Sequence, residues 1–167
     1  MDATMTLTNT STQTGLRTAL RDFYEDYAYH LDSGDLPGWV EFFTEDAHYR
    51  VISRENFSAG LPLGLIYCMN KNMIRDRVTA LTETTMYEPR QLRHFISGVR
   101  ITQTEDGILH AQANFLITEA LSDQEPTLNM VGLYLDQIVQ TEDGFQIRSR
   151  DCVYDNYRIR NSLIIPV

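Results

Sequence analysis

The sequence has few of the residues that mark cysteine-rich, membrane-spanning or nucleic-acid-binding proteins. It holds two cysteines, and Lys71 is the single lysine among 14 basic residues. No apolar run approaches the ~18 residues that a membrane span needs. The net charge of −9 disfavours binding to a phosphate backbone. The N-terminal residues lack both Lys or Arg and an apolar core, so we expect no signal peptide and a cytoplasmic protein.

The motifs for metals, nucleotides and serine nucleophiles are also missing. Cys68 and Cys152 lie far apart, so we expect reduced thiols rather than a disulfide. A Rieske cluster needs paired Cys and His motifs, and neither cysteine has a histidine beside it. The four histidines show no HxxxH or HExxH spacing, and GxGxxG, GxxxxGK[ST] and GxSxG patterns do not occur. We therefore predict that this chain binds no metal or cofactor of its own.

What is present is one domain's worth of chain, with 43% hydrophobic residues. Residues 1–13, rich in Thr, Ser and Asn, are predicted to form a flexible tail, and residues 14–167 a single domain. Apolar residues at helical spacing predict a helix over 14–32, ended by Gly34. Asp35 is expected to cap a short second helix that contains Pro37.

The middle of the chain is less regular. Alternation predicts a strand over 47–55, and the Gly- and Pro-rich stretch 56–65 is predicted to be a loop. A third helix is expected over 70–83, followed by a loop over 84–93.

The C-terminal part predicts a β-meander, with strands over 94–104, 108–121, 128–141 and 144–157. Asp106-Gly107 and Asp143-Gly144 separate two pairs of these strands, which is typical of hairpins. Strands of this length must curl, and the N-terminal helices are the available cover. The predicted fold class is α+β, with helices packed into a strongly curved antiparallel sheet. Alternation predicts these inward residues: Phe95, Val99, Ile101; Leu109, Ala111, Ala113, Phe115, Ile117; Val131, Leu133, Leu135, Val139.

A curved sheet could enclose an apolar pocket, where a carboxylate would have a raised pKa. Asp151 shares strand parity with Ile147 and Val153, so it is the candidate catalytic residue of an enzyme hypothesis, with His48 and Tyr24 as partners. The competing interpretation is that Asp151 pairs with an arginine and that the tyrosine belongs to the core. His48, His94 and His110 are expected on the polar face of their strands.

The last strand predicts a protein interface, because arginines alternate there with aromatic and apolar residues. A GC-rich genome would also favour arginine over lysine, and a solvated face is the alternative. The predicted interface residues are Arg148, Arg150, Tyr154, Arg158, Arg160 and Ile165.

Several segments together resemble the β subunits of aromatic-ring-hydroxylating dioxygenases. They are FYEDYAYHLDSGDLPGWVEFFTEDAHYRV near the N-terminus, MIRDRVTAL (73–81), YEPRQLRHFISGVRI (87–101) and RSRDCVYDNYRIRNSLIIPV (148–167). The resemblance spans about residues 15–167.

The resemblance implies the cone-shaped fold shared by nuclear transport factor 2 (NTF2) and scytalone dehydratase. It also implies an α3β3 hexamer whose large α subunit carries a Rieske [2Fe-2S] cluster and a mononuclear iron, while the β subunit is structural. Members acting on carboxylated single rings such as salicylate, anthranilate or terephthalate are the most similar in pattern. A free-standing dehydratase or isomerase of the same fold is the alternative, and a small-molecule binding module is a third hypothesis.

Overall fold

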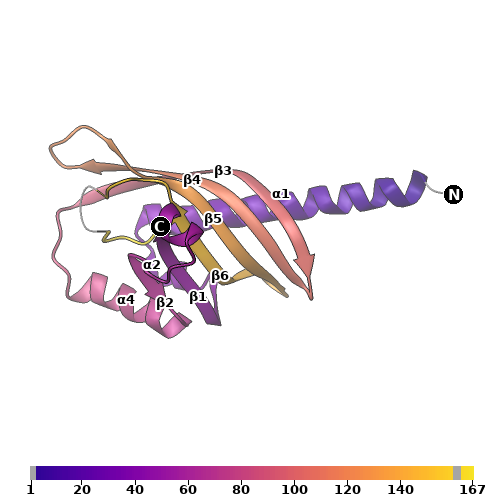
Figure 1. The fold of residues 1–167 in the computed structure, drawn as a ribbon, viewed down its shortest axis with the longest axis horizontal. Coiled ribbons are helices and arrows are strands. Elements are labelled where there is room, and N and C mark those ends of the chain that lie inside the picture. The colour runs from indigo at the N-terminus through magenta and orange to yellow at the C-terminus, as the bar shows by residue number, and fades with distance from the viewer. Residues whose placement is uncertain (1–2, 160–162) are drawn as a thin grey trace.

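The structure is a computed structural model that describes residues 3–159 and 163–167, with side chains from residue 14 onward. The first two strands lie among the helices and the other four strands follow them, as an α+β fold allows, and the sheet curves over the first helix (Figure 1). In chain order the elements are α1 (Ala3–Ser33), α2 (Leu36–Val40), β1 (Phe43–Ser53), α3 (Arg54–Ser58), β2 (Ile66–Cys68), α4 (Lys71–Glu83), β3 (Arg90–Glu105), β4 (Ile108–Leu121), β5 (Thr127–Thr141) and β6 (Gly144–Tyr154).

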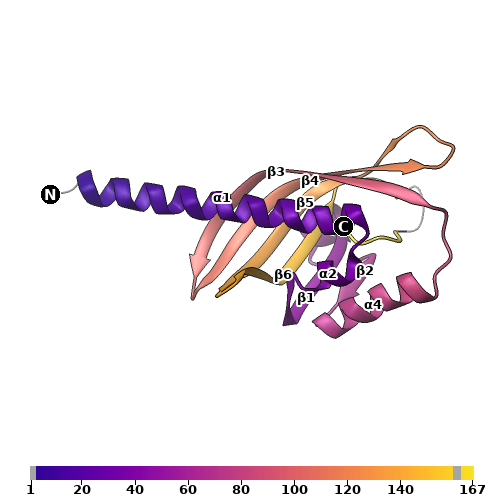
Figure 2. The ribbon, with the colours of Figure 1, turned by 180° about the vertical axis from the view of Figure 1, so that it is seen from behind.

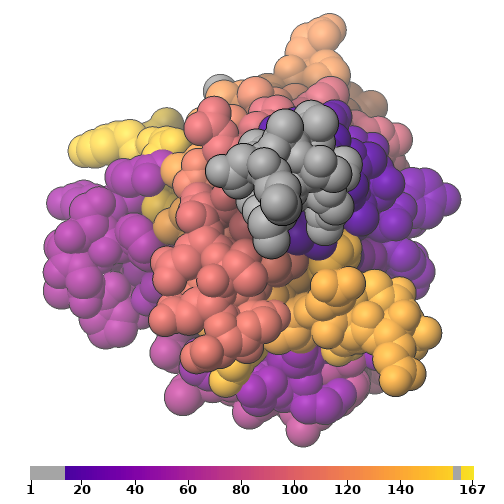
Figure 3. All heavy atoms as spheres, turned by 90° about the vertical axis from the view of Figure 1, so that its right-hand side faces the viewer, coloured from indigo at the N-terminus to yellow at the C-terminus, as the bar shows by residue number. Residues whose placement is uncertain are grey.

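All six strands form one sheet in the order β2-β1-β6-β5-β4-β3. The predicted meander β3-β4-β5-β6 is confirmed, and each of its neighbours is antiparallel. The sheet is not purely antiparallel, however, because β1 pairs with β6 in parallel. A parallel pair needs a long crossover, and here the whole segment between β1 and β6 provides it. Seen end-on, the β3–β4 turn in salmon and the β5–β6 turn in orange lie at the same end of the molecule (Figure 3).

Helix α1 lies along the inner face of the sheet (Figure 2). Its apolar stripe is buried, as the spacing predicts, and comprises Leu20, Tyr24, Tyr27 and Leu31. The helix begins at Ala3 rather than at the predicted residue 14, so the backbone of residues 3–13 is helical. Extending an existing helix adds one hydrogen bond per residue without a new nucleation cost, which composition alone does not reveal. No helix among the described residues is long and apolar enough to span a membrane.

The predicted helix ends are confirmed by their caps. Gly34 has φ 78°, the left-handed conformation that ends α1. The Asp35 carboxylate accepts a hydrogen bond from the Gly38 amide at 3.0 Å and starts α2. Asn70 caps α4 in the same way through the Met73 amide, at 3.0 Å.

Several boundaries differ from the sequence prediction. Strand β1 begins at Phe43 rather than at residue 47, and β3 begins at Arg90, within the predicted loop over 84–93. The expected loop over 56–65 begins within the short helix α3, because the Ser53 hydroxyl accepts from the Asn56 amide and caps it. Strand β2 follows that loop and was not predicted. Strand β6 ends at Tyr154 rather than at residue 157, since the Asn156 side chain contacts β5 from outside the sheet, through the Val131 amide at 3.0 Å.

The inward face is as predicted on β4, only in part on β3, and not on β5. On β4, the predicted residues from Leu109 to Ile117 are buried. On β3, Val99 and Ile101 pack against the core as predicted. Phe95 is instead 59% exposed and His94 is buried, because the register shifts between Ser97 and Arg100. On β5, the buried residues alternate with the predicted ones. The predicted residues lie half-buried on the outer face: Val131, Leu133, Leu135 and Val139. Both faces of β5 carry apolar residues, so alternation could not separate them.

Candidate functional site

The interior between α1 and the sheet holds a buried ion pair. Arg150 on β6 donates to Asp136 on β5 through Nε at 2.9 Å and Nη2 at 2.6 Å. The two residues are direct partners across the β5–β6 ladder, and both side chains are fully shielded from solvent. Tyr24 of α1 donates its hydroxyl proton to the same carboxylate. The Asp136 carboxylate therefore links helix α1 to strands β5 and β6 through hydrogen bonds.

Aromatic rings enclose this ion pair. The Arg150 guanidinium carbon lies 4.1 Å from the ring centroid of Tyr27 and 4.3 Å from that of Tyr134. Tyr24 provides a third ring, at 5.1 Å. Cation–π contacts are strongest where water is excluded, and these three tyrosines are fully buried. The rings and the carboxylate together replace the hydration that Arg150 loses.

Burial keeps the surrounding groups protonated. It raises the pKa of Tyr24, Tyr27 and Tyr134 above the ordinary value of 10.0, and for Tyr24 the adjacent Asp136 carboxylate adds to the effect. Burial also raises the pKa of the Cys152 thiol. Burial acts to lower the pKa of Arg150, but Asp136 and the neighbouring tyrosines outweigh it and raise that pKa above its ordinary value. At neutral pH the cluster thus holds one cation, one anion and neutral hydroxyls, with no free base.

The predicted catalytic group is not assembled. Asp151 lies on the outer side of β6 and accepts two hydrogen bonds from Arg50, at 2.7 and 2.8 Å. The β5–β6 register shifts between Gln137 and Ile138. Ile147 and Arg150 therefore both point inward, although strict alternation along the strand would place them on opposite faces. The prediction that Asp151 points inward was therefore wrong, and its competing interpretation as an arginine partner is confirmed.

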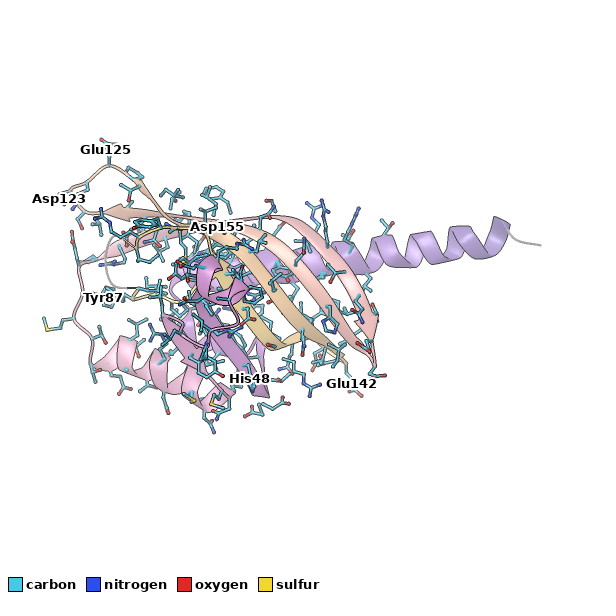
Figure 4. All side chains as sticks on the ribbon, viewed as in Figure 1. His48, Tyr87, Asp123, Glu125, Glu142 and Asp155 are labelled. Atoms are coloured by element: carbon cyan, nitrogen blue, oxygen red, sulfur yellow. The ribbon has the colours of Figure 1, made fainter. Side chains whose placement is uncertain are left out.

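The proposed partners of Asp151 lie apart from it. His48 is exposed on β1, and Figure 4 shows it at the edge of the molecule. Tyr24 is fully buried against Asp136 instead. The three residues that an enzyme would need together are thus divided between the interior and the outer surface.

The predicted interface residues differ in how exposed they are to solvent. Arg148 and Arg158 are exposed, and Tyr154 and Ile165 are half-buried. Arg160 lies outside the described residues. Arg150 has no exposed surface, so its assignment to an interface was wrong. The same register shift that turned Asp151 outward brought Arg150 into the core.

A second polar pair ties α1 to β3. His94 is buried, contrary to the expectation of a polar face, and its Nδ1 lies 2.7 Å from the Asp32 carboxylate. The same carboxylate accepts from the His94 amide at 3.1 and 3.2 Å. A hollow of about 470 Å³ lies beside this pair, and it is lined by Glu25, Ala28, Tyr29, Asp32, Ser33, Arg93, His94 and Ile96.

Residues 26–161 match the protein family described as the ring hydroxylating beta subunit. This chain belongs to that family. It is 36% identical over 141 residues to the anthranilate 1,2-dioxygenase small subunit of Burkholderia cepacia, an alignment that covers 84% of this chain and 88% of the relative. The resemblance inferred from the sequence is confirmed.

Solved structures confirm the fold as well. A structure described as the beta subunit of an aromatic-ring-hydroxylating dioxygenase from Novosphingobium aromaticivorans DSM 12444 superposes with a TM-score of 0.82 at 33% identity, covering 90% of this chain and 96% of the other. One described as a scytalone dehydratase from the same organism has a TM-score of 0.68 at 16% identity, covering 92% and 95%. The predicted NTF2-like cone is therefore the fold of this ring-hydroxylating beta subunit.

The central features of this beta subunit's interior were missed from the sequence. Asp136 stands between the inward Tyr134 and Ile138, so a charge on an inward position was the available signal. The local sequence did not identify Arg150 as the partner of Asp136. Arg150 and Asp151 are adjacent, and only the strand register determines which of the two points inward. No cluster of three or more metal-ligating side chains occurs among the residues that the structure describes.

Proposed function

We propose that this beta subunit is a non-catalytic structural component of a cytoplasmic aromatic-ring-hydroxylating oxygenase. In this proposal three copies join three large α subunits in an α3β3 hexamer. The α subunit holds the Rieske cluster and the mononuclear iron, and hydroxylates an aromatic compound. A carboxylated single ring such as anthranilate, salicylate or terephthalate is the proposed substrate, supported by the name of the anthranilate relative.

The observation that carries the structural role is the filled interior. The Asp136 carboxylate is bound by both Arg150 and Tyr24 where an enzyme of this fold would need an accessible acid or base. Large rings occupy the remaining space, among them Trp39, Phe43 and Phe115, none more than 1% exposed. This arrangement also disfavours the free-standing dehydratase or isomerase, since Asp151 is ion-paired with Arg50 on the outer side.

The outer face of the sheet supports a role in assembly. Phe95, Leu116 and Val131 are partners across β3, β4 and β5. Phe95 is 59% exposed and Leu116 is 37% exposed. Leu133 and Leu135 continue this outer apolar row on β5. Contiguous apolar surface on a folded chain is typical of a protein contact.

The arginine-rich surface near the end of β6 is the second proposed contact. We retain Arg148, Tyr154, Arg158 and Ile165 in it, together with Arg160 outside the described residues. Arg148 makes only a 3.7 Å contact with Asp46 at its exposed end, so its guanidinium can bind a partner carboxylate.

The two surfaces are tested by charge-introducing variants of the assembled oxygenase. Phe95→Glu and Arg148→Glu should each shift native mass from the hexamer toward free subunits, because a buried unpaired carboxylate is costly. Tyr29→Glu is the matched control, since Tyr29 is 68% exposed on α1 and lines a hollow with the inward residues His94 and Ile96, whereas Phe95 lies on the outer face. Hexamer mass that is unchanged in both test variants would exclude these surfaces from assembly.

A further inference from the structure

An apolar surface lies at the β2 edge of the sheet. Every second residue from Leu61 to Met69 carries a large, exposed apolar side chain, and Met73 in the first turn of α4 adds another. We call these residues the β2 edge surface, and each is between 40% and 70% exposed: Leu61, Leu63, Leu65, Tyr67, Met69 and Met73. Large apolar side chains gathered on the surface of a folded chain are typical of a protein contact.

Hydrogen bonds hold this surface in one conformation. The Leu65 amide donates to the Val51 carbonyl at 2.7 Å, directly beside the β1–β2 ladder. The Asn56 side chain donates to the Leu63 carbonyl at 2.9 Å, and the Asn56 carbonyl accepts from the Leu61 amide at 2.9 Å. The exposed side chains are thus presented by an ordered loop, so that binding a partner would cost little entropy for ordering it.

The β2 edge surface carries no charge. Residues 56–70 contain no Asp, Glu, Lys or Arg. The basic residues nearest to it along the chain, and the arginine opposite Tyr67 on β1, are already paired within the chain: Arg54 with Asp155, Lys71 with Glu41, and Arg50 with Asp151. A strongly charged partner would lose hydration here without gaining an ion pair. The surface therefore fits an uncharged, apolar partner.

The chain itself offers a second surface of this kind, the outer apolar row. Its most exposed members, Phe95 and Leu116, are paired across β3 and β4. These strands stand at the opposite end of the strand order from β2, and Figure 1 shows β2 and β3 on opposite sides of the sheet. One copy can therefore contact two others through different surfaces. Head-to-tail contacts of this kind close into a ring when the rotation between copies permits it.

We propose that the β2 edge surface of one copy binds the outer apolar row of the next copy, so that three copies form a head-to-tail ring. The number three rests on the proposed α3β3 assembly. The net charge of −9 favours this pairing, because copies of an acidic chain repel one another least where neither surface carries a carboxylate. Burial of the apolar side chains of both surfaces stabilises the contact.

The test uses the full-length chain without its large subunit, in sedimentation velocity over a range of concentrations. The unchanged chain should form trimers. Leu63→Glu and Phe95→Glu should each raise the concentration at which the trimer dissociates by about a hundredfold, since each buries a carboxylate without a partner. Tyr29→Glu, at an exposed position on α1 outside both surfaces, is the matched control and should remain trimeric.

A mixture of the two variants tests the head-to-tail geometry. Leu63→Glu keeps an intact outer apolar row, and Phe95→Glu keeps an intact β2 edge surface. An equal mixture should form one-to-one dimers at concentrations where each variant alone is monomeric. A mixture that stays monomeric, or a trimer that survives in either variant, would overturn the proposal. Tyr67→Glu takes the place of Leu63→Glu if circular dichroism shows that the latter fails to fold.

The same measurements separate this inference from the proposed function. A chain that is monomeric alone but assembles with the large subunit would overturn the ring and leave the structural role intact. A ring that forms through both surfaces, in a chain that binds no large subunit, would support the ring and contradict the structural role.

Discussion

At the scale of single residues, the Arg150–Asp136 pair explains how a charge can be stable inside this cone. Its two hydrogen bonds are supported by Tyr24 on the carboxylate and by three rings on the guanidinium. Removing one partner leaves the other charge buried and unpaired, which costs more than the pair itself contributes.

Arg150→Met should therefore lower the free energy of unfolding by about 3–5 kcal/mol, measured by urea denaturation. The double variant Arg150→Met/Asp136→Leu should recover most of that loss, because no unpaired charge remains. Arg148→Met, on an exposed position of the same strand, is the control and should change stability by less than about 0.5 kcal/mol. A single Arg150 variant as mild as this control would contradict the buried pair.

Alkaline pH provides a second test at this scale. Burial raises the pKa of four core tyrosines above 10.0, namely Tyr24, Tyr27, Tyr49 and Tyr134. Above about pH 10 the unfolded chain loses these protons while the folded chain keeps them, so stability falls as pH rises.

The urea midpoint should accordingly drop steeply between about pH 10 and pH 11.5. Tyr134→Phe should make that slope shallower by about one proton, while the exposed Tyr29→Phe should leave it unchanged. A midpoint that does not depend on pH in this range would show that the hydroxyls ionise without unfolding.

At the scale of elements, the register between strands determined which side chains point inward, and the sequence alone did not predict that register. Helix spacing, the cap of α2 and the Asp-Gly turns could be predicted from local chemistry, because each depends on residues close in the chain. The shifts on β3 and β6 depend on pairing with a distant strand. These shifts turn His94 and Arg150 inward and Phe95 and Asp151 outward. The strands were therefore predicted correctly, but the site residues on them were not.

Gly98 marks the shift on β3 and can be tested directly. It has φ 65°, and an added Cβ would lie 2.8 Å from the Asn114 amide nitrogen. Gly98→Ala should lower the free energy of unfolding by about 1–2 kcal/mol, since the left-handed conformation there favours glycine. Gly15→Ala, on α1 with open space around it, should instead raise it by about 0.5–1 kcal/mol. Equal effects in thermal denaturation would argue against a fixed shift at Gly98.

At the scale of the whole molecule, three features are consistent with one subunit of a larger enzyme. The interior is filled, the outer face of the sheet is apolar in part, and the family is that of ring-hydroxylating beta subunits. The net charge of −9 adds a constraint, because copies of this chain repel one another. A partner subunit that contributes arginine or lysine would offset that repulsion, which is the role we expect of the large subunit.

The most direct test of this account is to purify the tagged chain from its source organism, then measure native mass and visible absorption on the same fraction. The account predicts an α3β3 mass, with a larger chain in equal number and the absorption of a Rieske cluster. A colourless protein that elutes without a larger chain would contradict the central claim.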